Sequence, residues 1–551
     1  MHLRLPTVLA KLSFAIATTA CLLGCADAFV QSAEFVRFRV RGFERAFSVA
    51  DLETYVSTGI PSQQLRWYLN RLSPEQQAQL RQSLTTPLEI DAYTLLKMTR
   101  TPIGDSFLRH LLPLFGGDLA DEDQLAAVRA ALLLAADEGS INAINLIRKY
   151  PLTNLRLDLN AVVTAIADRQ QAIADVEALF AAIQGEREIV PAEPAAVSAI
   201  ASDTPITQVR GPLEWQRREL TFQNPRRDSD QWLVADVYLP QDLGTPAPLI
   251  VMSHGLANDR HSFVYAAEHL ASHGFAVASI QHPDTDYARL QSVLRGDTEL
   301  PNANLFLNRP GDIFALLDSL EQMQEDDTTW LSQINTQSVG LFGQSLGGYT
   351  VLAAGGARFD FEHLERNCQT FADDSIPLNV SEILQCQLLN LEERSQLPTD
   401  DRIAAIVALN PVGSAMFGPQ GMAEIDRPIA LVASSHDLVT PAVEEQVRPF
   451  TWLNSEDRYL LYVTPASHVS FVGNRPQSIE GIPSELLGPD SELAYPVMSW
   501  FAASFFDTYI NGTAEFNVLL AGEHWPANIG EYNYALTQEF SAAELEDAIG
   551  R

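Results

Sequence analysis

Residues 338–348 read Ser-Val-Gly-Leu-Phe-Gly-Gln-Ser-Leu-Gly-Gly, an apolar run that ends in glycines around Ser345. Gly343 and Gly347 stand two positions either side of that serine. Small residues at these two places let a strand and the following helix approach closely around a tight turn. The segment therefore predicts a strand, a turn that exposes the Ser345 hydroxyl, and a helix that continues to about Ala354. A serine in such a turn is a candidate nucleophile.

Strands and helices alternate along the chain on both sides of this turn. The short apolar runs that we interpret as further strands are 249–252, 275–280, 403–409, 429–433 and 459–463. Helical stretches such as 262–273 and 310–325 lie between predicted strands. This alternation predicts a mostly parallel sheet with helices on both faces. Active sites of such sheets lie at the carboxyl ends of the strands, where polar residues follow each of these runs.

A serine hydroxyl is a weak nucleophile at neutral pH. It needs a base, and the base needs a carboxylate that fixes its tautomer. The chain order in this architecture is serine, acid, histidine. Asp437 and His468 each follow a predicted strand, so we predict Ser345 as nucleophile, Asp437 as acid and His468 as base. His524, in a later loop, is the alternative base, and a turn-capping role is the alternative for Asp437.

The same chemistry requires N–H donors for a developing oxyanion. One donor is expected from the backbone of Leu346, directly after the serine. The second is expected from Leu256, in the segment His254-Gly255-Leu256 that follows another strand. His254 and Gly255 would support that loop, although a plain structural role for His254 fits equally well.

A cluster of His282, Asp284 and Asp286 also follows a predicted strand. Two carboxylates and an imidazole could bind a cation, but the predicted reaction needs none. We therefore interpret the cluster as the polar rim of a pocket and expect no metal and no cofactor.

These residues resemble the α/β-hydrolase superfamily. Within it they are most similar to the plasma-type platelet-activating-factor acetylhydrolases and the dienelactone-hydrolase-like esterases. The resemblance rests on Ser253-His254-Gly255-Leu256, Gly343-Gln344-Ser345-Leu346-Gly347-Gly348, Asp437 and His468, and it covers roughly residues 213–510. It implies an α/β-hydrolase fold and a serine carboxylesterase or lipase-like enzyme. Such an enzyme cleaves esters through an acyl-enzyme intermediate.

The resemblance also implies a substrate class, namely short-acyl esters with lipid-like or aromatic character, and hence a role in lipid degradation. Two alternatives remain open. A peptidase or amidase would use the same fold and the same chain order of residues. A non-catalytic binding protein of the cell envelope would use the fold only as a surface.

The N-terminal half has a different character. After a short strand pattern at 34–41, helical signals dominate residues 29–184, and no motif there carries chemistry. Residues 34–160 resemble an uncharacterised helical domain that precedes such hydrolase domains in exported bacterial proteins. We therefore predict a mainly helical accessory domain over 29–184, a Pro/Ala-rich linker over 185–212 and an α/β-hydrolase catalytic domain over 213–551.

The first 28 residues are typical of a signal peptide. Leu12–Leu23 is an apolar run of signal-core length and too short to span a bilayer. Cleavage after Ala26-Asp27-Ala28 would release a soluble product, whereas the segment ending in Gly24-Cys25 resembles a lipobox in which Cys25 is lipidated. The prediction is an exported protein that is periplasmic, extracellular or lipid-anchored. No later apolar run reaches about 18 residues, so no transmembrane span is expected.

Only two of the four cysteines, Cys368 and Cys386, lie outside the signal region. Two thiols this close in an exported chain predict a disulfide, and two free buried thiols are the alternative. Both fall in residues 358–401, between the helix after the nucleophile and the next strand. Hydrolases of this fold often carry a lid there, so we predict a lid-like insertion.

The charge balance argues against some classes of binding partner. Asp and Glu number 70 against 36 Lys and Arg, a formal net charge of −34. Such a surface repels phosphate backbones and anionic lipid headgroups, which argues against nucleic-acid binding and against a basic membrane-binding patch. The expected partner is a small-molecule ester substrate, and the oligomeric state is left open.

Overall fold

The computed structural model describes residues 32–550 apart from 41–42, 71–72, 88–90, 117–118, 140, 186–209, 229, 327–329, 374–378, 474–490, 514–519, 521–527 and 530–531. The predicted signal peptide 1–28 with Cys25, the alternative base His524 and most of the predicted linker 185–212 lie outside the described residues. By its contacts the chain divides into two compact units. The smaller unit combines the chain up to Pro87 with Phe115–Leu159, and the larger unit combines 88–114 with Asn160–Arg551.

The smaller unit pairs a three-stranded sheet with helices. Its strands are β1 (Phe35–Val40), β2 (Phe43–Ser48) and β3 (Asn154–Leu157), in the order β2-β1-β3, with β2 antiparallel and β3 parallel to β1. Its helices are α2 (Val49–Thr58), α3 (Gln63–Leu69), α4 (Pro74–Thr85), α7 (Asp121–Asp137) and α8 (Ala143–Lys149). Leu52, Tyr55, Leu65, Leu69 and Ile144 form a small buried core. The predicted N-terminal helical character and the first strand are confirmed.

Three helices of the predicted accessory segment 29–184 belong to the larger unit by their contacts. They are α5 (Ala92–Thr99), α6 (Pro102–Leu111) and α9 (Leu159–Gln184). Leu179 and Ile183 of α9 are buried in the same core as the large sheet, and the Phe180 ring centroid lies 6.1 Å from that of Tyr462. The bounds 29–184 of the predicted accessory domain stay a prediction.

The larger unit is built on a ten-stranded sheet, in the order β12-β13-β11-β10-β9-β8-β6-β7-β5-β4. Its strands are β4 (Trp215–Gln223), β5 (Trp232–Pro240), β6 (Ala247–Ser253), β7 (Ala276–Gln281), β8 (Ile334–Gln344), β9 (Ile403–Leu409), β10 (Ile429–Ser434), β11 (Arg458–Thr464), β12 (Asn528–Ile529) and β13 (Tyr532–Thr537). The six central strands from β11 to β7 run parallel, and an antiparallel pair flanks them on each side. The six central strands were predicted from the sequence, and the two flanking pairs were not.

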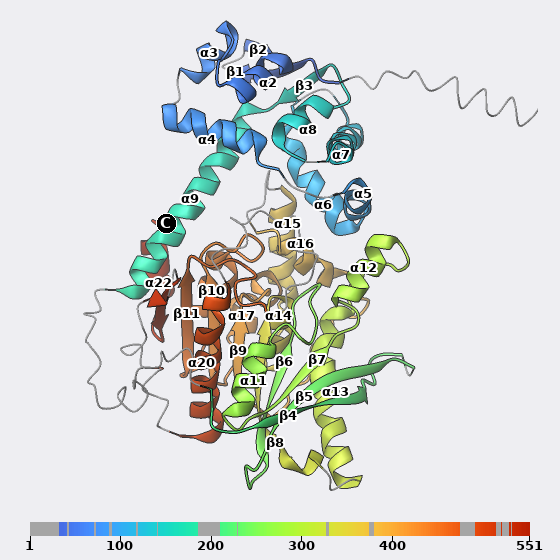
Figure 1. The fold of residues 1–551 in the computed structure, drawn as a ribbon, viewed down its shortest axis with the longest axis vertical. Helices are drawn as coiled ribbons and strands as arrows, with labels where there is room; N and C mark the ends of the chain where they lie inside the picture. The colour runs from blue at the N-terminus through green and yellow to red at the C-terminus, as the bar shows by residue number, and fades with distance from the viewer. Residues whose placement is uncertain are drawn as a thin grey trace, which may run out of the picture. The chain divides into compact units, whose positions relative to one another are not determined.

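Helices cover both faces of this sheet (Figure 1). The helices of the larger unit after α9 are α11 (Val264–Ser272), α12 (Tyr287–Arg295), α13 (Leu305–Asp326), α14 (Leu346–Ala354), α15 (Phe361–Asp373), α16 (Glu382–Gln385), α17 (Ser414–Met422), α18 (Arg448–Phe450), α20 (Tyr495–Phe506) and α22 (Ala542–Ala548). Successive strand residues point to opposite faces. Leu249 and Val251 accordingly join a core with α13, α14 and α17, whereas Ile250 and Met252 join one with α11 and α20. The predicted α/β-hydrolase fold is confirmed.

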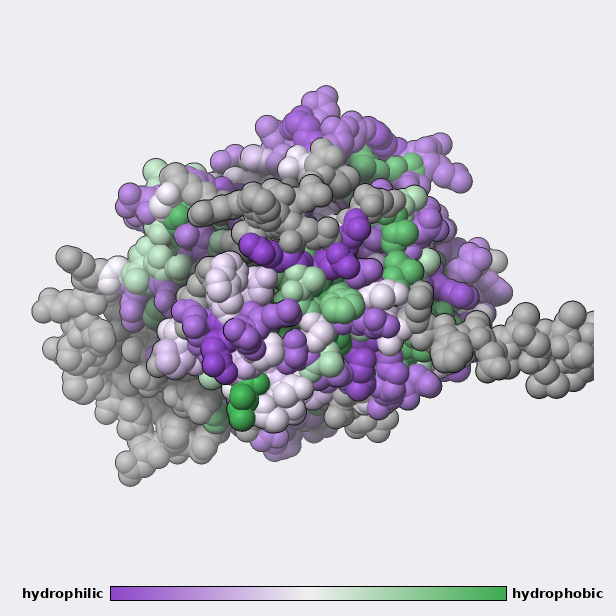
Figure 2. Space-filling view, turned by 90° about the horizontal axis from the view of Figure 1, so that it is seen from above, coloured by the Kyte–Doolittle hydropathy of each residue, from purple (hydrophilic) through white to green (hydrophobic). Residues whose placement is uncertain are grey.

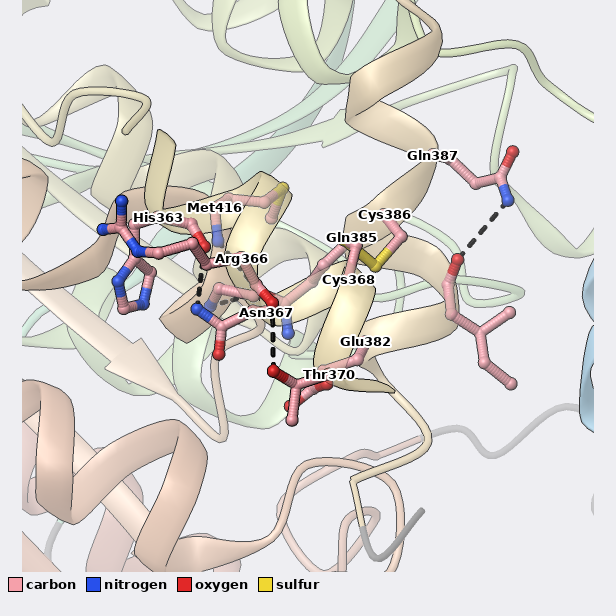
Figure 3. The surroundings of a disulfide bond; sticks show 12 residues. His363, Arg366, Asn367, Cys368, Thr370, Glu382, Gln385, Cys386, Gln387 and Met416 are labelled. Carbon is pink, nitrogen blue, oxygen red and sulfur yellow. Dashed lines mark hydrogen bonds between the residues drawn. A yellow bond between two sulfur atoms is a disulfide. The ribbon is translucent and has the colours of Figure 1, made fainter. Parts of the chain in front are cut away.

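The insertion between α14 and β9 contains α15 and α16, and a disulfide holds them together. Cys368 of α15 bonds to Cys386, directly after α16, with 5.8 Å between the Cα atoms. Figure 3 shows the bond, with Gln385 beside it on α16. The predicted disulfide is therefore present.

The same insertion has a second anchor, the buried carboxylate of Glu445. Glu445 lies in a helical turn at Val443–Val447 and is 1% exposed. From the insertion it accepts hydrogen bonds from Asn379 Nδ2 (2.6 Å), Ser381 Oγ (3.0 Å) and Gln385 Nε2 (2.6 Å). From the start of α17 it accepts three more: the Gly413 N–H, the Ser414 N–H and the Ser414 hydroxyl. Six donors therefore satisfy one buried negative charge.

We expect the double substitution Cys368→Ser, Cys386→Ser to lower the free energy of unfolding. The bond closes a loop over a sequence separation of 18 residues. On the chain-entropy model, loss of such a closure costs about 3 kcal/mol, because the unfolded chain regains its freedom. Urea unfolding of oxidised wild-type and variant protein measures the difference. Equal midpoints and slopes would show that the bond adds nothing to stability.

Candidate active site

The turn after β8 holds Ser345 in a conformation that few residues adopt. Its backbone angles are φ 58° and ψ −121°, a strained region for a residue with a Cβ. The Ser345 N–H donates to the Leu409 carbonyl at 2.9 Å, which fixes the turn against β9. A Cβ on Gly347 would lie 2.0 Å from the Ser253 carbonyl oxygen, and one on Gly343 would lie 2.2 Å from the Gly347 carbonyl oxygen. Both glycines are therefore required for this close approach of strand and helix.

The structure brings Ser345, His468 and Asp437 into one hydrogen-bonded row. His468 Nε2 lies 2.9 Å from Ser345 Oγ. On the other side of the ring, His468 Nδ1 lies 2.7 Å from Asp437 Oδ2. The three residues follow the carboxyl ends of β8, β10 and β11. This arrangement has the contacts that a nucleophile, a base and an orienting acid require.

Asp437 is kept ionised by its neighbours. Burial acts to raise the pKa of its carboxyl, but the adjacent His468 ring, the Thr440 N–H and the Asn410 amide outweigh it, and the pKa falls below its ordinary value. Oδ1 accepts from the N–H groups of Val439 (2.8 Å) and Thr440 (2.7 Å). Oδ2 accepts from Asn410 Nδ2 (2.6 Å) and the Thr440 hydroxyl (2.7 Å) as well as from His468. An ionised Asp437 holds the His468 proton on Nδ1 and leaves Nε2 free to accept.

Two residues that the sequence analysis missed support this row. Asn410 donates to Asp437, and the Gln344 amide donates to the His468 backbone carbonyl at 2.9 Å. Asn410 directly follows β9, so the strand-end rule that located Asp437 could have located it. Gln344 immediately precedes Ser345 and is buried. Nothing in its position along the chain predicted a contact with a loop more than a hundred residues away.

The loop after β6 lies directly against the nucleophile turn. A Cβ on Gly255 would stand 2.6 Å from Gln344 Oε1 and 3.3 Å from Ser345 Cβ. The predicted donors Leu256 and Leu346 therefore belong to two backbone segments that touch each other beside Ser345. Leu346 is the first residue of α14, and N–H groups in the first turn of a helix have no partner within the helix.

His254 braces that loop. Its Nε2 accepts the His282 N–H at 3.0 Å, so its proton is on Nδ1, which donates to the Gly255 carbonyl at 2.8 Å. Burial, together with the nearby Arg309 charge, holds the pKa of His254 well below its usual range. His254 therefore stays neutral; its Nδ1 contacts its own loop, and its Nε2 joins that loop to the segment after β7.

The residues of the predicted pocket rim have separate partners. His282 Nδ1 lies 2.7 Å from Asp312 Oδ2, and Asp284 accepts from Arg227 at 2.7 Å. Asp286 caps α12 by accepting the Arg289 N–H at 2.7 Å. The three side chains are engaged in these different contacts.

Comparison with known protein families gives two matches, in separate parts of the chain. Residues 236–302 match the family of the platelet-activating factor acetylhydrolase, isoform II. Residues 32–158 match a family described as an alpha/beta hydrolase of unknown function (DUF1400). No curated protein matches the chain. The first match contains the loop with His254 and Leu256 and ends before Ser345. The resemblance to α/β-hydrolases of the acetylhydrolase type is therefore confirmed, and the two matches support a hydrolase.

Two observations concern the hydrophobic character of the described residues, one on their helices and one on a face of the molecule. Where the structure describes the chain, none of its helices combines the length and the apolar character needed to cross a bilayer. The face drawn in Figure 2 is largely hydrophilic, and its hydrophobic residues form small separate groups.

The depressed pKa of Asp437 sets the direction of a pH effect on stability. Its unfolded-state pKa is about 3.9, so the stabilisation is fully present above that value and is lost as the pH falls through the lower folded-state pKa. We expect the free energy of unfolding of Asp437→Asn to lie below that of wild type at neutral pH. The gap should narrow as the pH falls below about 4. Denaturant titrations from neutral to acidic pH measure it, and a gap that stays constant would contradict this role.

Proposed function

We propose that this protein is an exported serine hydrolase that cleaves carboxylic esters, with Ser345 as nucleophile, His468 as general base and acid, and Asp437 as the group that orients His468. The observation that carries the proposal is the pair of contacts on the His468 ring, 2.9 Å to Ser345 Oγ and 2.7 Å to Asp437 Oδ2. The family match to an acetylhydrolase supports the ester class.

The first half of the reaction forms an acyl-enzyme. His468 Nε2 takes the Ser345 proton while Oγ attacks the carbonyl carbon of the ester, whose π electrons move to its oxygen. The N–H groups of Leu346 and Leu256 stabilise that oxyanion. When the C=O bond re-forms, the bond to the leaving oxygen breaks, and the leaving alkoxide takes the proton from His468. An alcohol departs and the acyl group stays on Ser345.

The second half releases the acid by the same steps with water. His468 Nε2 removes a proton from a water molecule, and the water oxygen attacks the acyl carbon. The tetrahedral intermediate again places its negative oxygen at the two N–H groups. Its collapse breaks the bond to Ser345 Oγ, which regains its proton from His468. Asp437 keeps its charge throughout and stabilises the imidazolium that forms in each half.

The substrate and the location belong to the proposal as well. The family resemblance favours short-acyl esters with lipid-like or aromatic character. The signal-peptide pattern of residues 1–28 supports export, with release or with a lipid anchor on Cys25. No feature of the site selects an amide leaving group. Peptide hydrolysis is therefore included as an outcome of the test below.

The serine assignment predicts that Ser345→Ala abolishes hydrolysis of p-nitrophenyl acetate, because the attacking oxygen is gone. Loss of a triad member removes a factor of roughly 10⁶ from kcat in enzymes of this type. The control is Ser338→Ala, near the middle of the strand that precedes Ser345, which should keep wild-type kcat and KM. Full activity of Ser345→Ala would contradict the assignment. If the wild-type protein cleaves peptides but no esters, the peptidase alternative would replace the ester proposal.

The same row makes a separate prediction for Asp437→Asn. The asparagine amide would donate to His468 Nδ1, so the ring proton would move to Nε2, where it faces Ser345 and blocks base action. We expect kcat to fall by about 10⁴ while the fold remains. Steady-state kinetics beside a circular-dichroism spectrum of the variant measures this. A kcat within tenfold of wild type would exclude Asp437 as the orienting acid.

A further inference from the structure

A fully buried arginine lies behind the candidate active site. Arg309, on α13, is 0% exposed. Its guanidinium donates to four oxygens: the Thr285 hydroxyl, the His254 carbonyl, Ser253 Oγ at 3.1 Å and Thr350 Oγ1 at 2.9 Å. Burial lowers the pKa of Arg309 to about 9, so the group is charged at neutral pH. A buried cation that donates to four neutral oxygens is costly, and the residues it joins indicate its role.

One side of Arg309 holds the loop that carries the Leu256 N–H, one of the two predicted oxyanion donors. The guanidinium binds the His254 carbonyl and the Ser253 hydroxyl, directly before Gly255. The His254 ring in turn donates to the Gly255 carbonyl at 2.8 Å. That carbonyl and the Leu256 N–H lie on opposite edges of the same trans peptide. Fixing the carbonyl toward His254 therefore directs the Leu256 N–H away from the ring.

The other side of Arg309 reaches Leu346, which carries the other predicted donor. Thr350 Oγ1 accepts from Arg309 at 2.9 Å and donates its own proton to the Leu346 carbonyl at 2.7 Å. Thr350 lies one turn along α14 from Leu346. The chain of contacts from Arg309 through Thr350 thus ends on the residue that carries the other oxyanion N–H.

The remaining contacts fix the network in place. His282 Nδ1 donates to Asp312 (2.7 Å), and His282 Nε2 accepts the Ser253 hydroxyl proton (2.9 Å), which leaves Ser253 Oγ free to accept from Arg309. Asp312 is also held by Arg227 through Nε and an NH₂ group, both at 2.7 Å. Each of these groups has a defined partner, so the network has little freedom to rearrange.

We propose that Arg309 is a positioning residue of the proposed ester hydrolysis, which holds the two backbone segments of the oxyanion hole in register by binding the His254 carbonyl on one side and the Thr350 hydroxyl on the other. This inference rests on the proposed function. Arg309 touches no reacting atom. It acts on the transition state alone, because the ground-state ester does not require both N–H groups at oxyanion distance.

The test uses the full chain with Arg309→Lys and Thr350→Val. Lysine keeps the charge but cannot reach both sides at once, and valine keeps the shape of threonine without its hydroxyl. We expect kcat for p-nitrophenyl acetate to fall about tenfold or more in Arg309→Lys, with KM within about twofold. Affinity for a trifluoromethyl ketone, which forms an oxyanion adduct on Ser345, should fall by the same factor as kcat/KM.

The matched control is Arg402→Lys. Arg402 binds Asp400, Asp318 and Glu321 at the amino end of β9. Ser345 lies at the carboxyl ends of the parallel strands, so the two residues are at opposite ends of the sheet. Arg402→Lys makes the same substitution at this other end of the strands and should keep wild-type kcat and inhibitor affinity. A purely structural role for Arg309 would lower thermal stability as in this control and leave the kinetics alone.

Folded Arg309→Lys with wild-type kcat and inhibitor affinity would overturn the inference. If Arg309→Lys does not fold, Thr350→Val decides: a fall in kcat and in inhibitor affinity at constant KM supports the role of Arg309, and wild-type kinetics overturns it. A wild-type protein that neither hydrolyses the ester nor binds the trifluoromethyl ketone would overturn the proposed function and this inference together. An active wild type with an unaffected variant would remove only the role of Arg309.

Discussion

The contact between the Gly347 backbone and the Ser253 carbonyl is the constraint around which the larger unit is arranged. It brings the helix after the nucleophile against the end of β6, closer than any side chain would permit. The positive φ of Ser345 follows from the same turn, which has to reverse the chain within a few residues. Because two backbone segments meet here without side chains between them, the segments that contain Leu346 and Leu256 come together beside Ser345.

Three buried carboxylates organise the polar groups around this contact. Asp437 accepts hydrogen bonds from the loops after β9, β10 and β11. Asp312 binds Arg227 and His282. Glu445 joins the insertion to α17. A buried charge is tolerated only when it is well satisfied. Each of these carboxylates therefore specifies the position of several donors at once. The precise geometry of the site follows from such saturated groups more than from the sheet itself.

The sequence predicted the parallel centre of the sheet because buried parallel strands read as continuous apolar runs. It did not predict β4, β5, β12 and β13, because these strands form antiparallel pairs without an intervening helix, and the alternation of strands and helices does not mark them. The residues in the row of Ser345, Asp437 and His468 were each visible as polar side chains at strand ends. Gln344 and Arg309 were not, since their importance lies in contacts with segments distant in sequence. Local pattern cannot reveal such contacts.

The Glu445 anchor has a consequence for how the insertion can move. Swinging α16 outward would strip three hydrogen bonds from a buried charge, those of Asn379, Ser381 and Gln385. Hydrogen bonds to charged groups are worth roughly 1.5–3 kcal/mol each, and the Cys368–Cys386 bond would have to move with the helix. These contacts therefore hold α16 in place. If the insertion acts as the predicted lid, the part that opens has to be another segment of it.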